Sequence, residues 1–422
     1  MRLFCGNVLL FLFGGLSLLV SGAEDTLKFV HAVWRHGDRS PSGTFPTDTE
    51  NGEETWPQGF GELSEIGVRQ HYNLGRWLRD RYDGFLFANY SSFQIYVRST
   101  GYNRTIMSAL SNLAGLFPPE GTQKWSDTIL WQPIPVHNRP RETDPMLWME
   151  APCPKESSLF GDVMKSKEVL KIMEENKDFI QFLRNKTGSP LPVLDDMWSV
   201  FDPLNCEMRH NDTHQWPSWV TTEIFQRIKM LHDLSTKFYY YTDDIQRLRG
   251  GLLLGDLTTR FQQVSVNSID SRLKFYIYSA HDTTVNSLLS VLHAYNGLNP
   301  PYTALILLEL HQMDKEYYVK LLYKNETDNP PYDLKIGWCP AQKGTLCKLE
   351  DFISNGRKFV PEDWNAECEN SKPASSTYKF ASLIVAGVLL FLCVILLIAL
   401  IVTSIHLKKI RNAGGLLTSI DT

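Results

Sequence analysis

The 422-residue sequence lacks the motifs of several common enzyme classes. It contains no G-x-S-x-G pentapeptide, so a serine hydrolase has no support, and Gly59 and Gly61 lack the third glycine of a dinucleotide-binding fingerprint. Its seven cysteines form no C-x-x-C pair and show no zinc-ligand spacing. An excess of positive charge is absent too: the formal net charge is −5, and an acidic surface repels polyanions, so we exclude nucleic acid as a partner.

The composition, with 43% hydrophobic and 21% charged residues, is that of a globular protein. The length allows two or three ordinary domains, or one large α/β domain that carries an insertion. Two segments near the ends of the chain are far more apolar than this average, and we expect neither to belong to the globular fold.

The first 23 residues have the pattern of a secretory signal peptide. Arg2 supplies the positive charge, residues 9–20 are a short apolar core, and small residues at 21–23 fit a cleavage site. The apolar run is too short to span a bilayer, and Gly14 and Gly15 disfavour the alternative of a buried helix. We therefore expect residues 1–23 to be removed on export.

Residues 380–405 are almost wholly apolar and are numerous enough to cross a membrane. Basic residues follow this segment, and basic flanks remain in the cytoplasm. The sequence therefore predicts a type I membrane protein with an ectodomain at residues 24–379, one transmembrane helix at 380–405 and a cytoplasmic tail at 406–422.

Glycosylation sequons and cysteines agree with export of the ectodomain. Five Asn-x-Ser/Thr sequons lie between the two apolar segments, at Asn89, Asn103, Asn185, Asn211 and Asn325. Five cysteines lie there as well, and an odd number leaves at least one of them without an intrachain partner.

Short apolar segments of the ectodomain have the pattern of buried strands, and amphipathic helical segments lie between them. The strands are predicted at residues 28–34, 93–97 and 274–278. This alternation is typical of an α/β fold with a mostly parallel sheet flanked by helices. Residues 154–254 differ, because helical stretches there are broken by a section rich in proline and tryptophan. We predict an α/β core at about 24–153 and 255–370, with a helical cap inserted at about 154–254.

Charged residues follow directly after these strands. Ligands of open α/β sheets bind at the carboxyl ends of the strands, so we expect these residues to share one site. The predicted site contains Arg35, His36, Arg39, Arg104, His281 and Asp282. Three guanidinium groups match the oxygens of a phosphoryl group better than those of a single carboxylate. The sequence thus predicts a phosphate site, and a surface ion-pair network is the alternative.

Within this cluster, His36 is the predicted nucleophile and Asp282 the predicted proton donor. A neutral imidazole can attack phosphorus, and the surrounding cations keep the pKa of His36 low enough to leave one ring nitrogen free. Asp282 would protonate the leaving alkoxide, which requires an acidic operating pH, and would then act as the base when water hydrolyses the phosphohistidine. The arginines supply the charge stabilisation, so no metal and no cofactor is expected.

The other histidines show no such pattern. His210 and His214 have the spacing of metal ligands, but the Asn211 sequon between them favours an exposed loop. We interpret the remaining ones as structural: His31, His71, His232, His293 and His311.

Several blocks of the sequence resemble the histidine acid phosphatases, in particular the animal lysosomal and prostatic enzymes in their membrane-bound form. The run from Arg35 to Pro41 and the run from Tyr278 to Asp282 carry the resemblance. Four further blocks in the same order narrow it, at residues 56–61, 116–121, 131–137 and 361–364. The resemblance extends over nearly all of residues 27–368.

The resemblance implies a phosphoglycerate-mutase-like fold with a helical cap over the sheet, and a homodimer. It implies His36 as nucleophile, Asp282 as proton donor, and as phosphate ligands Arg35, Arg39, Arg104 and His281. It further implies hydrolysis of a broad range of small phosphomonoesters, with phosphoproteins or phospholipids as additional candidate substrates. The catalytic domain is expected on the luminal or extracellular side of the lysosomal or plasma membrane.

The sequence departs from the family pattern beside the predicted phosphate site. Gly101 and Asn103 stand where the family usually has two carboxylates, which makes the predicted pocket more cationic. A glycan on Asn103 would obstruct the site, so we expect that sequon to be unused. The sequons predicted to carry glycans are Asn89, Asn185, Asn211 and Asn325.

A second departure concerns the cysteines. The resemblance implies the disulfides Cys153–Cys368 and Cys339–Cys347. The usual partner of Cys206 is replaced by Leu305, so Cys206 is predicted to be a free thiol or to pair between chains.

These features predict a metal-independent acid phosphatase that works through a phosphohistidine. Among enzymes, the alternative is a narrower phosphatase, for example one for phytate or lysophosphatidate. From another class, the alternative is a catalytically weak ectodomain with a role in adhesion or signalling, if Gly101 and Asn103 disable turnover.

Overall fold

The computed structural model describes residues 26–189, 194–325, 329–340, 344–369, 389–390 and 392–409 of the chain. The predicted signal peptide, the first residues of the predicted membrane helix and residues 410–422 lie outside the described residues. The chain divides into two compact units, Met1–Glu367 and Cys368–Thr422. Everything that bears on the predicted site lies in the first unit.

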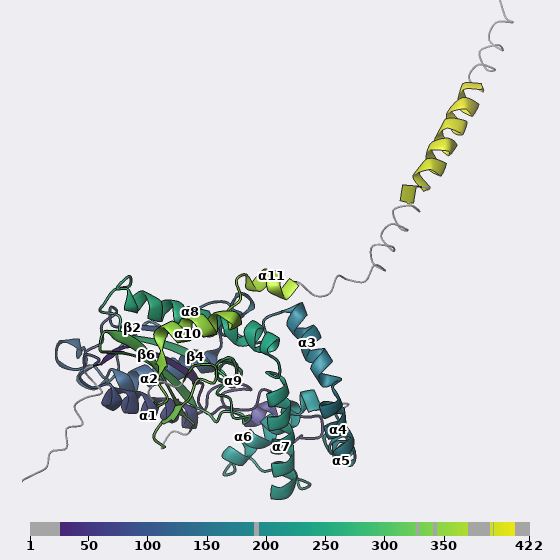
Figure 1. Cartoon of the computed structure of the whole chain (residues 1–422). Helices are drawn as coiled ribbons and strands as arrows, with labels where there is room; N and C mark the ends of the chain where they lie inside the picture. The colour runs from purple at the N-terminus through teal and green to yellow at the C-terminus, as the bar shows by residue number, and fades with distance from the viewer. Residues whose placement is uncertain are drawn as a thin grey trace, which may run out of the picture. The chain divides into compact units, whose positions relative to one another are not determined.

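Eight strands among the described residues form one mixed sheet in this unit (Figure 1). They are β1 (Leu27–Arg35), β2 (Ile95–Ser99), β3 (His137–Asn138), β4 (Phe275–Ala280), β5 (Leu305–Met313), β6 (Glu316–Lys324), β7 (Tyr332–Leu334) and β8 (Cys347–Lys348). The strand order is β3-β2-β4-β1-β5-β6-β7, and β8 pairs with β6.

The sheet is parallel only in one half. Strands β3, β2, β4 and β1 run parallel, whereas β5 to β8 join by antiparallel pairs. The three predicted strands became β1, β2 and β4, so the expectation of a mostly parallel sheet holds for the half in which the predicted site lies. Strands β5 and β6 are joined by a two-residue turn, the hairpin connection that antiparallel strands permit without a crossover helix.

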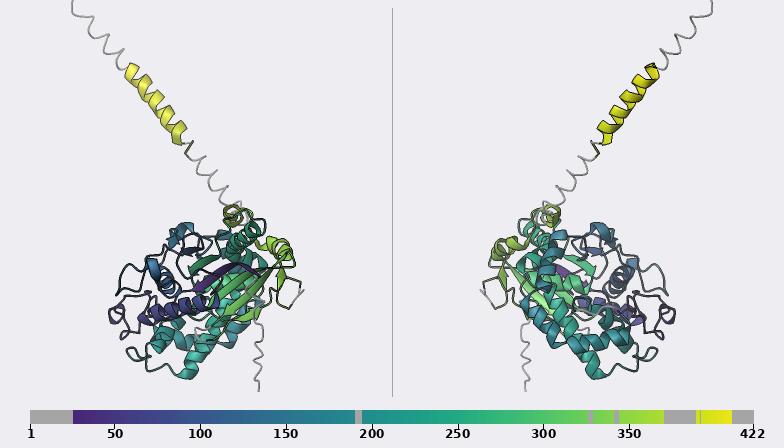
Figure 2. Two further views of the ribbon diagram at one scale, coloured as in Figure 1. Left: turned by 90° about the vertical axis from the view of Figure 1, so that its left-hand side faces the viewer. Right: turned by 90° about the vertical axis from the view of Figure 1, so that its right-hand side faces the viewer.

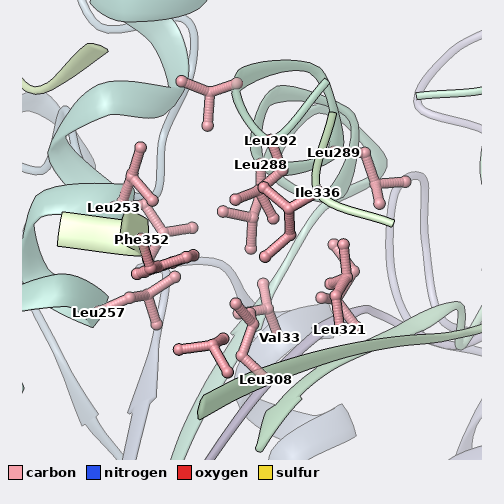
Figure 3. Packing of buried hydrophobic residues seen from close by; sticks show 14 of the residues in the cluster. Val33, Leu253, Leu257, Leu288, Leu289, Leu292, Leu308, Leu321, Ile336 and Phe352 are labelled. Atoms are coloured by element: carbon pink, nitrogen blue, oxygen red, sulfur yellow. The ribbon is translucent and has the colours of Figure 1, made fainter. Parts of the chain in front are cut away.

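Helices cover both faces of the sheet, which explains why its strands are apolar on both sides. The helices are α1 (Glu65–Arg81) and α2 (Asn103–Leu116) on one face, and α8 (Asp243–Ser265), α9 (Asp282–Val291) and α10 (Leu349–Gly356) on the other. Figure 3 shows the second face, where Val33, Leu308 and Leu321 of the sheet pack toward Leu257 and Phe352. Alternate β1 residues, such as Trp34, pack in the other layer.

Helices α1 and α2 cross at very short range, because Gly75 of α1 carries no side chain. A Cβ atom at Gly75 would lie 1.9 Å from the backbone oxygen of Asn112 in α2. Ser64 caps the start of α1, as its side chain accepts a hydrogen bond from the backbone nitrogen of Gly67. The close contact between α1 and α2 at Gly75 places the first turn of α2, which contains Arg104, near the end of β1.

A group of helices between α2 and α8 has its own apolar core and lies beside the sheet (Figures 1 and 2). They are α3 (Pro154–Met164), α4 (Lys167–Glu175), α5 (Lys177–Thr187), α6 (Trp198–Arg209) and α7 (Thr222–Phe238). The insertion predicted at 154–254 contains all five and the first half of α8. The second half of α8 packs on the sheet, for example through Leu257 and Phe261. We call α3 to α7 the cap.

Short helical turns complete the described structure. They are η1 (Glu53–Thr55), η2 (Gly121–Gln123), η3 (Arg141–Thr143), η4 (Leu194–Asp196), η5 (Arg357–Phe359) and the helix α11 (Trp364–Glu369). In the second unit, Leu392–Lys409 is a helix long and apolar enough to cross a membrane.

The described cysteines of the first unit and Cys368 are either disulfide-bonded or free. Cys339 and Cys347 form a disulfide, and Cys153 and Cys368 are each disulfide-bonded. Cys206 is a free thiol with no exposed surface, which matches one of the two alternatives left open by the sequence.

Candidate active site

The residues predicted to form one site do come together in the structure. Arg35 is the last residue of β1, and His281 directly follows β4, with which β1 pairs in parallel. Arg104 lies in the first turn of α2, and Asp282 begins α9. A cavity of about 620 Å³ lies at this point between the sheet and the cap. The described residues from the predicted cluster that line it are His36, Arg39, Arg104, His281 and Asp282.

His36 is 2% exposed and is positioned by backbone groups. Its backbone nitrogen donates to the Ala280 oxygen at 2.9 Å, and its Nδ1 lies 2.8 Å from the Gly37 oxygen. Because a carbonyl oxygen only accepts, Nδ1 carries the proton and Nε2 keeps its lone pair. Gly37 permits this turn, since a Cβ atom there would lie 2.5 Å from the Gly67 oxygen.

The ring of His36 is neutral in this environment. Burial lowers its pKa well below the usual range, and the positive charges of Arg104, Arg35 and Arg39 lower it further. A neutral ring with an unprotonated Nε2 is a nucleophile at acidic as well as neutral pH. The sequence predicts this lowering of the pKa from the cations alone, whereas burial is its larger cause.

Two of the arginines are held by carbonyl groups and aromatic rings. Arg35 lies over the Tyr302 ring at 4.3 Å and donates to the Pro300 backbone oxygen. Arg104 lies over the Tyr102 ring at 4.4 Å and donates to the Gly61 oxygen at 3.3 Å. Burial and the charge of Arg39 lower the pKa of Arg104 to about 10, so it stays cationic at acidic pH.

The third arginine, Arg39, is oriented by a residue that the sequence did not reveal. Asp202 of the cap helix α6 accepts two hydrogen bonds from Arg39, at 2.7 and 3.1 Å, and both side chains are buried. Although burial alone would lower it, this carboxylate raises the pKa of Arg39 well above its ordinary value. The cap thus contributes directly to the cationic site. No motif surrounds Asp202, which is why its role could not be predicted.

The carboxyl group of Asp282, the predicted proton donor, is held in its ionised form by its neighbours in the free site. Its carboxylate pairs with Arg35 at 2.9 Å. Although burial alone would raise it, the charges of Arg35 and Arg39 lower the pKa of Asp282 to about 2. A proton must therefore reach Asp282 together with a ligand.

His281 completes the cluster from the β4 side. Its Nε2 lies 2.9 Å from the hydroxyl oxygen of Thr100, and its ring centre lies 5.6 Å from that of His36. Burial, and then the charge of Arg104, lower its pKa well below the usual range. His281 is therefore a second neutral imidazole beside His36.

Gly101 and Asn103, which depart from the family pattern, are not among the residues of the described cavity lining. Asn103 is exposed, and its side-chain amide donates to Glu62 at 3.0 Å. A Cβ atom at Gly101 would lie 2.9 Å from the backbone oxygen of Arg139, so glycine allows the chain to pass closely there. Neither residue contacts His36 or Asp282.

His210 and His214 lie in a turn after α6, but they are not exposed as predicted. His214 is buried and stacks on the Trp56 ring at 3.7 Å. His210 is half-buried, and its Nε2 lies 2.7 Å from a carboxylate oxygen of the buried Asp38. These contacts tie the cap to the segment that follows His36. The sequon at Asn211 is exposed beside them.

The remaining walls of the cavity are rich in carboxylates and aromatic rings. The described acidic residues on these walls are Glu150, Glu156, Asp195 and Asp196. Glu156 pairs with Arg249 at 2.6 Å. His232 of α7, which we had interpreted as structural, also lines the cavity. No motif marks these residues, because tertiary packing between the cap and the loops before it brings them to the cavity.

Comparisons with known proteins agree with this geometry. The family model described as "Histidine phosphatase superfamily (branch 2)" matches residues 26–324. The chain is 42% identical to the prostatic acid phosphatase of Homo sapiens, over 83% of this chain and 90% of that protein. It is 38% identical to the lysosomal acid phosphatase of Homo sapiens, over 89% of this chain and 88% of that protein.

Solved structures support the fold. The phytase of Citrobacter braakii superimposes with a TM-score of 0.62, at 17% identity, over 81% of this chain and 99% of that chain. The Klebsiella sp. phytase gives a TM-score of 0.61 at the same identity. These are likenesses of architecture: an α/β sheet flanked by helices as predicted, although the sheet is mixed where the prediction was mostly parallel.

The contact between Asp202 and Arg39 yields a testable prediction. Asp202→Asn keeps the shape of the side chain but removes its charge, so Arg39 loses the partner that orients it. We expect the affinity for inorganic phosphate, measured by calorimetry at pH 5, to fall about tenfold. The free energy of unfolding should fall by about 3 kcal/mol, because a buried charge is left unpaired.

The matched control is Asp256→Asn, which breaks the Arg260–Asp256 pair outside the described cavity lining. It should cost stability without weakening phosphate binding. Equal phosphate affinity in Asp202→Asn and the unaltered protein would contradict the positioning role of Asp202.

Proposed function

Because the chain belongs to the histidine phosphatase superfamily (branch 2), we propose that it is an acid phosphatase that hydrolyses phosphomonoesters through a phosphohistidine at His36. One observation carries the proposal. A buried, neutral imidazole, with Nδ1 turned to the Gly37 oxygen, lies in the field of Arg35, Arg39 and Arg104. That combination offers a nucleophile and a binding site for a phosphoryl group at the same point.

In the first chemical step, Nε2 of His36 attacks phosphorus and the bond from phosphorus to the ester oxygen breaks. The leaving oxygen takes a proton from the carboxyl group of Asp282. The guanidinium groups of the three arginines donate hydrogen bonds to the phosphoryl oxygens, whose charge they stabilise in the transition state. The products are the free alcohol and a phosphorylated, positively charged imidazole ring.

In the second step, the carboxylate of Asp282 takes a proton from a water molecule. The water oxygen attacks phosphorus, the nitrogen–phosphorus bond breaks, and its electron pair returns to Nε2. Phosphate leaves and neutral His36 is restored. The same carboxyl group thus serves as acid and then as base.

The low pKa of Asp282 requires that the substrate bring the proton. A phosphate monoester loses its second proton near pH 6, so the monoanion predominates below that value. When the monoanion binds, its charge draws Arg35 away from Asp282 and adds a negative neighbour, and both effects raise the pKa of Asp282. The proton can then pass from the phosphoryl group through Asp282 to the leaving oxygen.

This account predicts the pH dependence of the rate. As pH rises through the second pKa of the substrate, about 6, the monoanion is lost and kcat/KM falls. The alkaline limb should therefore shift to lower pH for aryl phosphates of lower pKa and to higher pH for alkyl phosphates. If the alkaline limb of the kcat/KM profile lies at the same pH for all of these substrates, the titration of an enzyme group determines that limb instead.

Two variants test the assigned roles with the full chain in detergent. His36→Ala should show no turnover of p-nitrophenyl phosphate or glycerol 2-phosphate at pH 5. Asp282→Asn should lose about a thousandfold in rate on glycerol 2-phosphate, whose alkoxide needs a proton. Its loss on p-nitrophenyl phosphate should be smaller, since p-nitrophenolate leaves without one. Turnover by His36→Ala, or equal losses by Asp282→Asn on both substrates, would refute these assignments.

The alternative of a catalytically weak ectodomain is not favoured. His36, Arg39, Arg104 and Asp282 line the cavity, and Arg35 pairs with Asp282 directly beside it. Gly101 and Asn103 are not in the described cavity lining, and Asn103 bonds to Glu62. Asn103 nevertheless neighbours Arg104, so a glycan on it would lie near the mouth of the site. We retain the proposal that this sequon is unused.

The C-terminal apolar helix is consistent with a membrane-anchored protein, as is the similarity to lysosomal acid phosphatase. We infer a type I orientation in which residues 24–379, the catalytic ectodomain, face the lysosomal lumen or the cell exterior. Exposed sequon residues support this orientation, namely Asn89, Asn185 and Asn211, while Asn325 is half-buried. An unchanged electrophoretic mass after enzymatic deglycosylation would contradict it.

We also propose a homodimer, as the family resemblance implies. Helices α1 and α2 leave an apolar patch on their outer side, with Val68, Tyr72 and Trp131 each about two-fifths exposed. Large exposed apolar patches commonly mark contact surfaces, and a second copy of the chain would cover this one. Sedimentation of the solubilised protein as a single chain would refute the dimer.

A further inference from the structure

His232 is a buried histidine whose hydrogen-bonding groups are unused. It belongs to the cap helix α7, is 5% exposed, and lines the active-site cavity. Neither ring nitrogen has a hydrogen-bond partner among the described residues. An unpaired buried polar group is costly, so such a group beside a cavity indicates that a ligand supplies the partner.

The ring of His232 is oriented and neutral. It stacks on the Phe201 ring with 4.3 Å between centres and 14° between planes, so its nitrogen-bearing edges lie in a fixed plane. Burial lowers its pKa to about 4, although the nearby Asp233 and Asp282 act in the opposite direction. The neutral ring offers one donor and one acceptor. His232 and Asp282 line the same cavity.

A second unpartnered polar atom in the cavity lining belongs to the sheet domain. Asn286 follows Asp282 by one turn of α9, is fully buried, and lines the same cavity. Its side-chain nitrogen donates to Asn299 at 3.4 Å, whereas its Oδ1 has no partner among the described residues. The cap and the sheet domain thus each contribute to the cavity lining a residue with an unpartnered polar group, and Asp282 belongs to the same lining.

His31 resembles His232 in its burial but lies outside the described cavity lining. His31 is also buried with two unpartnered nitrogens among the described residues, but it packs in the sheet layer among Phe29, Phe261 and Tyr278. It does not belong to the described cavity lining. His31 therefore lies away from the cavity, whereas His232 is part of its described lining.

We propose that His232 and Asn286 form a leaving-group subsite that hydrogen-bonds the hydroxyl groups of a neutral, hydroxylated alcohol. This proposal rests on the proposed phosphatase function and specifies its substrate class. A hydroxyl group both donates and accepts, so it can satisfy a ring nitrogen of His232 and the Oδ1 atom of Asn286. Buried polar groups that bond a substrate hydroxyl select against substrates without that hydroxyl, because the groups are then left unpaired.

The charges on the other walls support a neutral leaving group. Glu150, Asp195 and Asp196 line the cavity, and Arg249 there is paired with Glu156. A second phosphate group on the substrate would meet these carboxylates and be repelled. The subsite therefore differs from one that accepts a polyphosphorylated alcohol, and phytate is expected to be a poor substrate.

The test compares two substrates on the full chain at pH 5. Glycerol 2-phosphate carries hydroxyl groups next to the ester oxygen, and phenyl phosphate carries none. His232→Phe retains the stacking on Phe201 but removes both nitrogens. We expect the ratio of kcat/KM for glycerol 2-phosphate to that for phenyl phosphate to fall about tenfold, as for the loss of one hydrogen bond to a substrate. His232→Asn, which keeps a donor and an acceptor, should give a higher ratio than His232→Phe.

His31→Phe is the matched control, because it removes the same two nitrogens from another buried site and should leave the ratio unchanged. An unchanged ratio in His232→Phe, or an equal fall in His31→Phe, would overturn the subsite. If His232→Phe does not fold, Asn286→Ala is measured in the same way, and an unchanged ratio there overturns it as well. Absence of turnover of both substrates by the unaltered protein would instead refute the phosphatase function itself.

Discussion

A buried imidazole kept neutral beside three guanidinium groups is the arrangement on which the rest of the site depends. Burial and positive neighbours act in the same direction on His36, so its nucleophilic nitrogen stays unprotonated at acidic pH. The same cations lower the pKa of Asp282 and keep it ionised until a ligand arrives. In our proposal, one set of charges thus keeps the nucleophile unprotonated, binds the phosphoryl group and determines when Asp282 becomes protonated.

Residues from β1, from the end of β4, from α2 and from the cap come together at this site. Parallel pairing of β1 with β4 places Arg35 next to Ala280, at the strand ends where His36 and His281 begin. The close crossing of α1 and α2 brings Arg104 to the same point. The cap supplies Asp202 to hold Arg39 and, in our proposal, His232 to hold the leaving group. In our proposal, the residues that react with the substrate lie at the sheet. The cap orients Arg39 and selects the leaving group of the substrate.

Much of this could be predicted from the sequence, because strand ends followed by charged residues specify a place in an α/β fold. That reasoning found His36, Arg39 and Asp282, and it found three of the four parallel strands. It could not find Asp202 or His232, since these residues belong to cap helices whose docking depends on tertiary packing. Nor could it predict that Asp282 is ionised, because the pKa follows from a contact with Arg35 that the sequence does not contain.

The central claim is that Nε2 of His36 carries the phosphoryl group between the two steps. The most direct test is to mix the enzyme with 32P-labelled substrate, quench within milliseconds in alkali, and locate the label by peptide mass spectrometry. The account predicts a label on the peptide that contains His36, stable in alkali and released by acid. A turning-over enzyme without a labelled peptide, or with the label on another residue, would contradict it.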